Sequence, residues 1–147
     1  IEFEPQSFLQ TEEMESIDLF VCGSHMSGLP LNSQLTQLGA KFLCSAETSP
    51  YYRMFILPPT ESLPIRPGLV RCSEETVSLP GELWRMPIKN FGAFMLKIRF
   101  PLGISQIKLK NGETEYGFCC DHSGVGNCKE ITHMGGWRKY LAEKSID

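Results

Sequence analysis

The sequence lacks the patterns that mark several large functional classes. No apolar run approaches the roughly 18 residues that a membrane-spanning helix requires. The chain shows neither a phosphate-binding P-loop, nor the G-x-G-x-x-G of dinucleotide folds, nor the G-x-S-x-G elbow of hydrolases. It also has no signal-peptide pattern and no initiator methionine, so we expect it to be a piece of a longer protein.

The charge and the length of the chain limit its possible partners and its number of domains. The net charge of the 147 residues is -3, which argues against nucleic acid or an acidic membrane surface as a partner. This length suits one domain with a core of its own. Residues 1–15 carry five acidic side chains and no sustained periodicity, so we interpret them as an arm or linker. Residues 16–147 are then expected to form a single domain.

Six cysteines are present, but no C-x-x-C motif. Most lie in apolar, strand-like runs, where a free thiol behaves as a small hydrophobic group. We therefore expect free thiols and a reducing, cytoplasmic location, with Cys128 in a glycine-rich loop the most reactive. A zinc site can be drawn from five residues, but their spacing matches no common pattern, and we expect no metal: Cys119, Cys120, His122, Cys128 and His133.

Hydrophobic periodicity predicts an α+β fold with a mostly antiparallel, barrel-like sheet and flanking helices. Strands are expected at 17–21, 42–46, 51–57, 67–72 and 78–86. Asn111-Gly112 lies between two alternating runs and predicts a β-hairpin. Helices are expected around Leu31, Leu35 and Leu38 up to Gly39, from 87 to 98, and from 136 to 144. The 87–98 helix would place four residues on one face: Phe91, Phe94, Met95 and Ile98.

The loop CGSHMSG, residues 22–28, is the strongest candidate for chemistry. Small residues allow the backbone to approach a ligand, and consecutive N–H groups in a turn can bind an anion. His25 in this position could bind or protonate an anionic substrate near neutral pH. The alternative is that the glycines only form the turn and that His25 is an ordinary surface residue.

Glu82 lies inside an apolar strand, where a buried carboxylate requires a partner. Its role is open between a structural acid and an acid of the site. Arg53, in the similarly apolar run YYRMFIL, is the most obvious partner for it.

Six segments in this order closely resemble the C-terminal domain of allophanate hydrolase, over residues 18–141. These are FVCGSHMSGLPLNSQLTQLGAKFL, YYRMFILP, RPGLVR, PGELWRMPIKNFGAFM, PLGIS and ITHMGGWRKYL. The resemblance implies a fold like that of γ-glutamyl cyclotransferases, a small mixed barrel whose substrate loop follows the first strand. Those enzymes use a glutamate for which GAFMLKIRF offers no acidic equivalent, so cyclotransferase chemistry on a γ-glutamyl amine is a less favoured alternative.

The resemblance also implies a place in urea degradation. The amidase part of allophanate hydrolase, absent from this chain and therefore an expected partner, produces N-carboxycarbamate. The C-terminal domain is taken to decarboxylate this small, dicarboxylate-like substrate without a cofactor. In this interpretation His25 is the catalytic acid, and the following residues bind substrate: Gly23, Ser24, Met26, Asn32, Tyr52, Arg53 and Glu82. The alternative is a non-catalytic accessory or oligomerisation module of the amidase.

Overall fold

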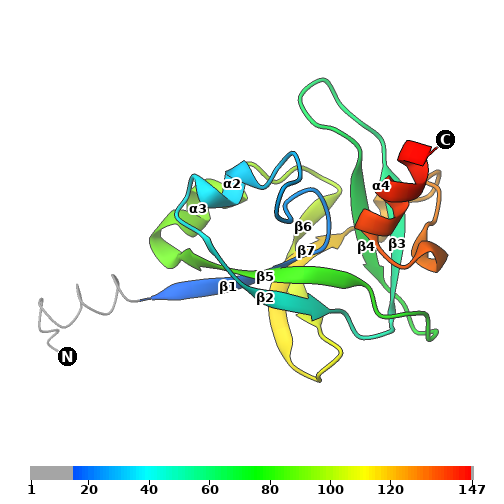
Figure 1. The fold of residues 1–147 in the computed structure, drawn as a ribbon, viewed down its shortest axis with the longest axis horizontal. Helices are drawn as coiled ribbons and strands as arrows, with labels where there is room; N and C mark the ends of the chain where they lie inside the picture. The colour runs from blue at the N-terminus through cyan, green and yellow to red at the C-terminus, as the bar shows by residue number, and fades with distance from the viewer. Residues whose placement is uncertain (1–14, 147) are drawn as a thin grey trace, which may run out of the picture.

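The computed structural model describes residues 15–146, and its chain path is shown in Figure 1. The strands are β1 (Ser16–Val21), β2 (Lys41–Glu47), β3 (Tyr52–Leu57), β4 (Arg66–Arg71), β5 (Pro80–Pro87), β6 (Leu102–Lys108) and β7 (Thr114–Cys120). The α-helices are α2 (Ser33–Thr36), α3 (Phe91–Met95) and α4 (Trp137–Ile146). Short 3₁₀ helices lie at Ile88–Asn90, His122–Gly124 and Thr132–Met134.

The strands form two sheets. Five strands follow the order β2-β5-β1-β7-β6, and β3 pairs separately with β4. Only the β1–β7 pair is parallel, through Leu19–Tyr116 and Phe20–Gly117, while the other pairs are antiparallel. In Figure 1, α2 and α3 lie near one end of the long sheet and α4 near the other. The predicted α+β class and mostly antiparallel pairing are confirmed, although the strands form two open sheets rather than a closed ring.

The central strand β1 explains the position of the candidate loop. Leu19, Phe20 and Val21 are each 1% exposed, as expected for a strand covered on both faces. Its neighbours approach closely because they carry glycine: a Cβ at Gly81 or Gly117 would lie 2.6 Å from a carbonyl oxygen of β1. The end of β1, and hence the loop after it, is therefore held from both sides.

The predicted helix at 87–98 is wrong in its start and its length. Pro87 pairs with Ser16 as the last residue of β5, and a 3₁₀ turn separates it from the five-residue α3. Phe94 is fully buried as predicted, but Met95 is 39% exposed, so the four residues do not share a buried face. The pairing of Pro87 with β1 outweighs its preference for a helix start.

Other local predictions agree with the structure. Asn111-Gly112 does connect β6 to β7, with Gly112 at a φ of 90°. The helix around Leu35 shrinks to one turn, and Gly39 at φ 82° follows it as a stop. Helix α4 begins one residue after Gly136, and none of the helices in residues 15–146 is long and apolar enough to cross a membrane. The predicted arm lies almost wholly outside the described residues.

All six cysteines lie within the described residues and are free thiols. Their burial is more varied than expected, because only Cys22 and Cys120 are buried and Cys44 is exposed. Burial, with a smaller contribution from Cys119, raises the pKa of Cys22 to about 12. The Cys22 side chain, 5% exposed, is therefore not suited to act as a nucleophile.

Candidate active site

The loop after β1 is ordered by its own hydrogen bonds. The Met26 N–H donates to the Gly23 carbonyl at 3.0 Å, and the Leu31 N–H donates to Ser24 at 2.9 Å. Gly28, at φ 78°, allows the chain to reverse. Within the described residues no acceptor is found for the N–H groups of Ser24 and His25. The Met26 N–H is therefore already engaged, whereas those of Ser24 and His25 remain available to an anion.

His25 is buried, with 8% of its surface exposed, rather than displayed on the surface. Its ring stacks on Phe118 at a centroid distance of 4.6 Å and meets the edge of Phe94 at 5.6 Å. Its Nε2 lies 2.8 Å from Oε1 of Gln34 in α2. Because a carbonyl oxygen only accepts, Nε2 carries the proton, and Nδ1 is the nitrogen left for a ligand.

The surroundings of His25 favour its neutral form. Burial lowers the pKa of His25 below its usual value of 6.5; the Gln34 hydrogen bond opposes this shift, and the Arg66 charge adds to it. The ligand-free domain therefore disfavours the imidazolium that a general acid requires. An anion beside the ring would reverse the shift, because a negative charge favours the protonated imidazole.

A small cavity of about 30 Å³ lies beside this loop. Its lining combines loop residues with side chains of β4, β6 and β7: Cys22, Gly23, Ser24, His25, Arg66, Pro67, Leu69, Leu102 and Phe118. A Cβ at Gly23 would overlap the ring of Pro67, so only glycine allows the loop to pack against β4. The predicted residues Gly23, Ser24 and His25 therefore do meet at one cavity.

Arg66 is the residue that the sequence analysis missed. It is 6% exposed, and its Nε has no hydrogen-bond partner among the described residues. A guanidinium nitrogen that is buried without a hydrogen-bond acceptor is rare, because its desolvation is then uncompensated. The available signal was an arginine at the beginning of the apolar run RPGLVR, but the pattern does not show which loop covers it.

Glu82 is buried on the other side of the loop and binds Ser27. Its Oε1 accepts the Ser27 N–H at 2.8 Å, the Ser27 hydroxyl at 3.0 Å and the indole N–H of Trp84 at 3.0 Å. Arg138 of α4 donates from one nitrogen to Glu82 Oε2 at 3.2 Å and to the Ser27 carbonyl at 2.7 Å. Burial would raise the pKa of Glu82, but these hydrogen bonds together lower it.

Arg53 is not the partner of Glu82, contrary to expectation. It pairs instead with Glu74 at 2.8 Å and with Glu130 at 3.3 Å. Successive β-strand residues point to opposite faces, and Arg53 and Glu82 belong to different sheets, so their similar apolar contexts did not make them neighbours. The mate is Arg138, 56 residues further along the chain.

The remaining predicted residues are dispersed. Met26 and Glu82 line a second, more open cavity of about 880 Å³ between β2, β5 and α4. Tyr52 is buried and its hydroxyl accepts from the Lys108 N–H at 2.9 Å, away from both cavities. The Asn32 side chain donates to the His25 carbonyl at 2.7 Å and so supports the loop. None of the cavities described within residues 15–146 is lined by all eight predicted residues.

The two cavities differ in their electrostatics. In the larger one Glu82 and Arg138 are paired with each other. In the smaller one His25 and Arg66 present two basic groups to the same space, without a carboxylate among the lining residues. The smaller cavity is therefore the one suited to an anion.

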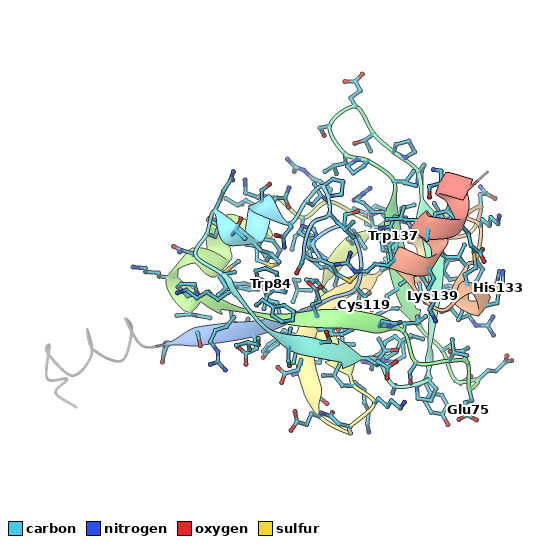
Figure 2. The ribbon with its side chains drawn as sticks, in the orientation of Figure 1. Glu75, Trp84, Cys119, His133, Trp137 and Lys139 are labelled. Atoms are coloured by element: carbon cyan, nitrogen blue, oxygen red, sulfur yellow. The ribbon has the colours of Figure 1, made fainter. Side chains whose placement is uncertain are left out.

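No metal site accompanies the loop. Among residues 15–146, no three histidine, cysteine or acidic side chains are grouped so that they could hold a metal ion. Cys119 and His133, two members of the zinc set considered above, lie well apart in Figure 2.

Comparison with known families adds independent evidence. Residues 17–142 match the family model described as the allophanate hydrolase C-terminal domain. The chain belongs to this family. The resemblance inferred from its motifs is thereby confirmed.

Relatives of the domain occur in long and short chains. The chain is 38% identical over 130 residues to urea amidolyase of Lachancea kluyveri, covering 86% of this chain and 7% of that protein. Kluyveromyces lactis allophanate hydrolase is similar with a TM-score of 0.83 and 32% identity, over 88% of this chain and 22% of that one. A protein specific to uropathogenic E. coli reaches a TM-score of 0.80 and 29% identity, over 88% of this chain and 98% of that one.

A γ-glutamyl cyclotransferase shares the fold, with a TM-score of 0.56 and 14% identity, over 79% of this chain and 70% of that one. This similarity confirms the expected fold of the allophanate hydrolase C-terminal domain. Helix α3, FGAFM, carries no acidic side chain, so the carboxylate expected of a cyclotransferase is absent from this element.

Proposed function

We propose that this domain decarboxylates N-carboxycarbamate, the dianion ⁻O₂C–NH–CO₂⁻, to carbamate and carbon dioxide. The observation that carries the proposal is the position of His25, buried beside an anion-sized cavity that also contains Arg66. Membership of the allophanate hydrolase C-terminal family supports the substrate class. The amidase that supplies this substrate is the partner that we propose.

The reaction needs a proton at nitrogen. When the carbon–nitrogen bond breaks, carbon dioxide leaves and the electron pair of the bond returns to nitrogen. His25 donates a proton from Nδ1 to that nitrogen, while Nε2 keeps its own proton and donates a hydrogen bond to Gln34 Oε1. The N–H groups of Ser24 and His25 bind the carboxylate that remains. The products, carbamate and carbon dioxide, then balance the dianion plus one proton.

Substrate binding prepares the acid. In the free domain His25 is biased toward its neutral form, so it takes up a proton when the dianion enters. Its stacking on Phe118 fixes the plane of the ring, so the proton is aimed at one place in the cavity. The domain thus combines a positioned acid with a site that excludes most water.

The test couples this chain to a competent allophanate amidase and follows carbon dioxide and ammonia separately. Addition of the domain should accelerate carbon dioxide release without changing the first release of ammonia. Unchanged carbon dioxide release at saturating domain would contradict the proposal. A Lys139→Met domain serves as the matched control, because Lys139 does not line the small cavity.

One observation favours the alternative role as an accessory module. Leu96 and Phe100, which follow α3, are 78% and 73% exposed, and both are large apolar side chains. Such residues are suited to contact with another chain or domain. If the domain is only such a module, Leu96→Glu should weaken its association with the amidase, and His25→Asn should leave carbon dioxide release unchanged.

A further inference from the structure

We propose that Arg66 is the charged anchor of a buried anion site and that it binds one carboxylate of a small dicarboxylate. This assignment deepens the proposed function, because it identifies the charge that retains the substrate. Binding can be measured without turnover, so the two proposals can fail separately.

The first argument is the missing countercharge. The guanidinium group stays protonated in proteins and presents five N–H donors. Arg66 is 6% exposed, its Nε has no acceptor within residues 15–146, and none of the ion pairs found there includes it. A buried charge in this condition is unfavourable until an anion joins it.

The second argument is the shape of the space beside Arg66. A volume of about 30 Å³ accommodates a group of about two or three heavy atoms, since one water needs about 10–15 Å³ by the same measure. Much of the lining is apolar, with Leu69, Leu102 and Phe118 contributing side chains. One carboxylate fits such a space, and the rest of a dicarboxylate would then extend beyond it.

The third argument is the arrangement of the other donors. Ser24 and His25 line the same cavity, and no acceptor is found among the described residues for their backbone N–H groups. Arg66, the first residue of β4, lines this same cavity. A dicarboxylate can therefore contact Arg66 with one end and the loop with the other, whereas acetate can satisfy only one of them.

The experiment measures thermal unfolding and malonate binding for the wild type, Arg66→Met and Arg71→Met. Malonate is the probe, with acetate and chloride at matched ionic strength as competing anions. Arg71 is the control because it lies at the other end of β4, where it donates to the Gln106 carbonyl at 2.6 Å. Malonate should raise the melting temperature of the wild type and of Arg71→Met, as any ligand of the native state does.

Arg66→Met should differ from both in two respects. Without ligand its melting temperature should equal or exceed that of the wild type, because an unpaired buried charge has been removed. Its affinity for malonate should fall at least ten-fold. Failure of Arg66→Met to fold, a clear loss of melting temperature, or unchanged malonate binding would each overturn the assignment.

Arg66→Lys separates charge from geometry. It keeps the positive charge but loses the two-pronged hydrogen bonding, so malonate should bind more weakly than to the wild type and more tightly than to Arg66→Met. Affinity equal to that of the wild type would contradict a guanidinium–carboxylate contact. If malonate binds as expected and carbon dioxide release is not accelerated, the anion site stands and the proposed reaction fails.

Discussion

The side-chain amide oxygen of Gln34 lies 2.8 Å from Nε2 of His25. This hydrogen bond determines which ring nitrogen of the imidazole carries the proton. Gln34 is one of only four residues in α2. The short helix thus supplies the residue that orients the proposed acid, and Gln34 is best described as a positioning residue.

Gln34→Glu should raise the pKa of His25, because a carboxylate stabilises the imidazolium that a neutral amide leaves disfavoured. The measurement is an NMR titration of the histidine ring signals. His122 and His133 lie on separate 3₁₀ helices, so their ring signals serve as internal references. A His25 pKa that stays unchanged would show that Gln34 does not control its protonation.

His25→Asn should reduce carbon dioxide release by roughly 10²–10⁴-fold, the usual contribution of a positioned general acid. It should also lower stability by about 1–3 kcal/mol, because the ring is buried and packs on two aromatic side chains. Malonate should still bind through Arg66, and full activity with a large loss of stability would make His25 purely structural.

Stability should decline as the pH falls below about 6.5, the pKa of an unfolded histidine. The sign follows from the lowered pKa of native His25: the unfolded chain binds a proton first, so the advantage of the neutral native ring is lost toward lower pH. Arg66 is the nearby charge that opposes protonation. The free energy of unfolding, measured with urea, should therefore decline more steeply between pH 7.5 and pH 5 for the wild type than for His25→Asn.

Malonate should weaken this dependence, because a bound anion raises the pKa of His25 again. Malonate affinity itself should increase as the pH falls through this range. An affinity independent of pH, in a domain whose malonate site contains His25, would contradict proton uptake on binding.

Glu82→Gln should destabilise the domain by about 1–3 kcal/mol, because an amide cannot accept all the hydrogen bonds now made by the carboxylate. Glu74→Gln is the matched control, with a side chain 78% exposed, and should cost less than about 0.5 kcal/mol. The native pKa of Glu82 is lowered, so its contribution is present above about pH 4.5 and is lost as the pH falls through the lowered value. The free energy of unfolding in urea should differ between the wild type and Glu82→Gln at pH 7, and this difference should be smaller at pH 3. Equal losses for the two variants at pH 7 would mean that Glu82 does not brace the loop.

Much of the fold could be predicted because its signals are local. The near-continuous apolarity of 17–21 is typical of a mostly buried strand, and Asn111-Gly112 has the conformational freedom that a tight hairpin needs. Pro87 misled the prediction because its role was decided by pairing with Ser16, more than 70 positions earlier in the chain. Local propensity has no information about such a partner.

Some residues of the candidate site could likewise be predicted from local sequence, and others could not. Gly23, Ser24 and His25 are consecutive, so a turn of small residues was visible as a unit. Arg66 and Arg138 complete the two sides of the loop, but each comes from a distant segment. Their roles depend on how deeply they are buried and on whether they have hydrogen-bond partners. Neither property is defined until β4 and α4 pack against the loop.

The parallel pairing of β1 with β7 has a consequence for how the domain is made. Leu19 and Tyr116 become neighbours only after nearly a hundred intervening residues have been synthesised, and Arg138 reaches Ser27 later still. Contacts so distant in sequence are slow to form, because the chain must first close a long loop. During synthesis at the ribosome, the loop that contains His25 would therefore not reach its final conformation until α4 has emerged. The anion site would be among the last parts of the domain to form.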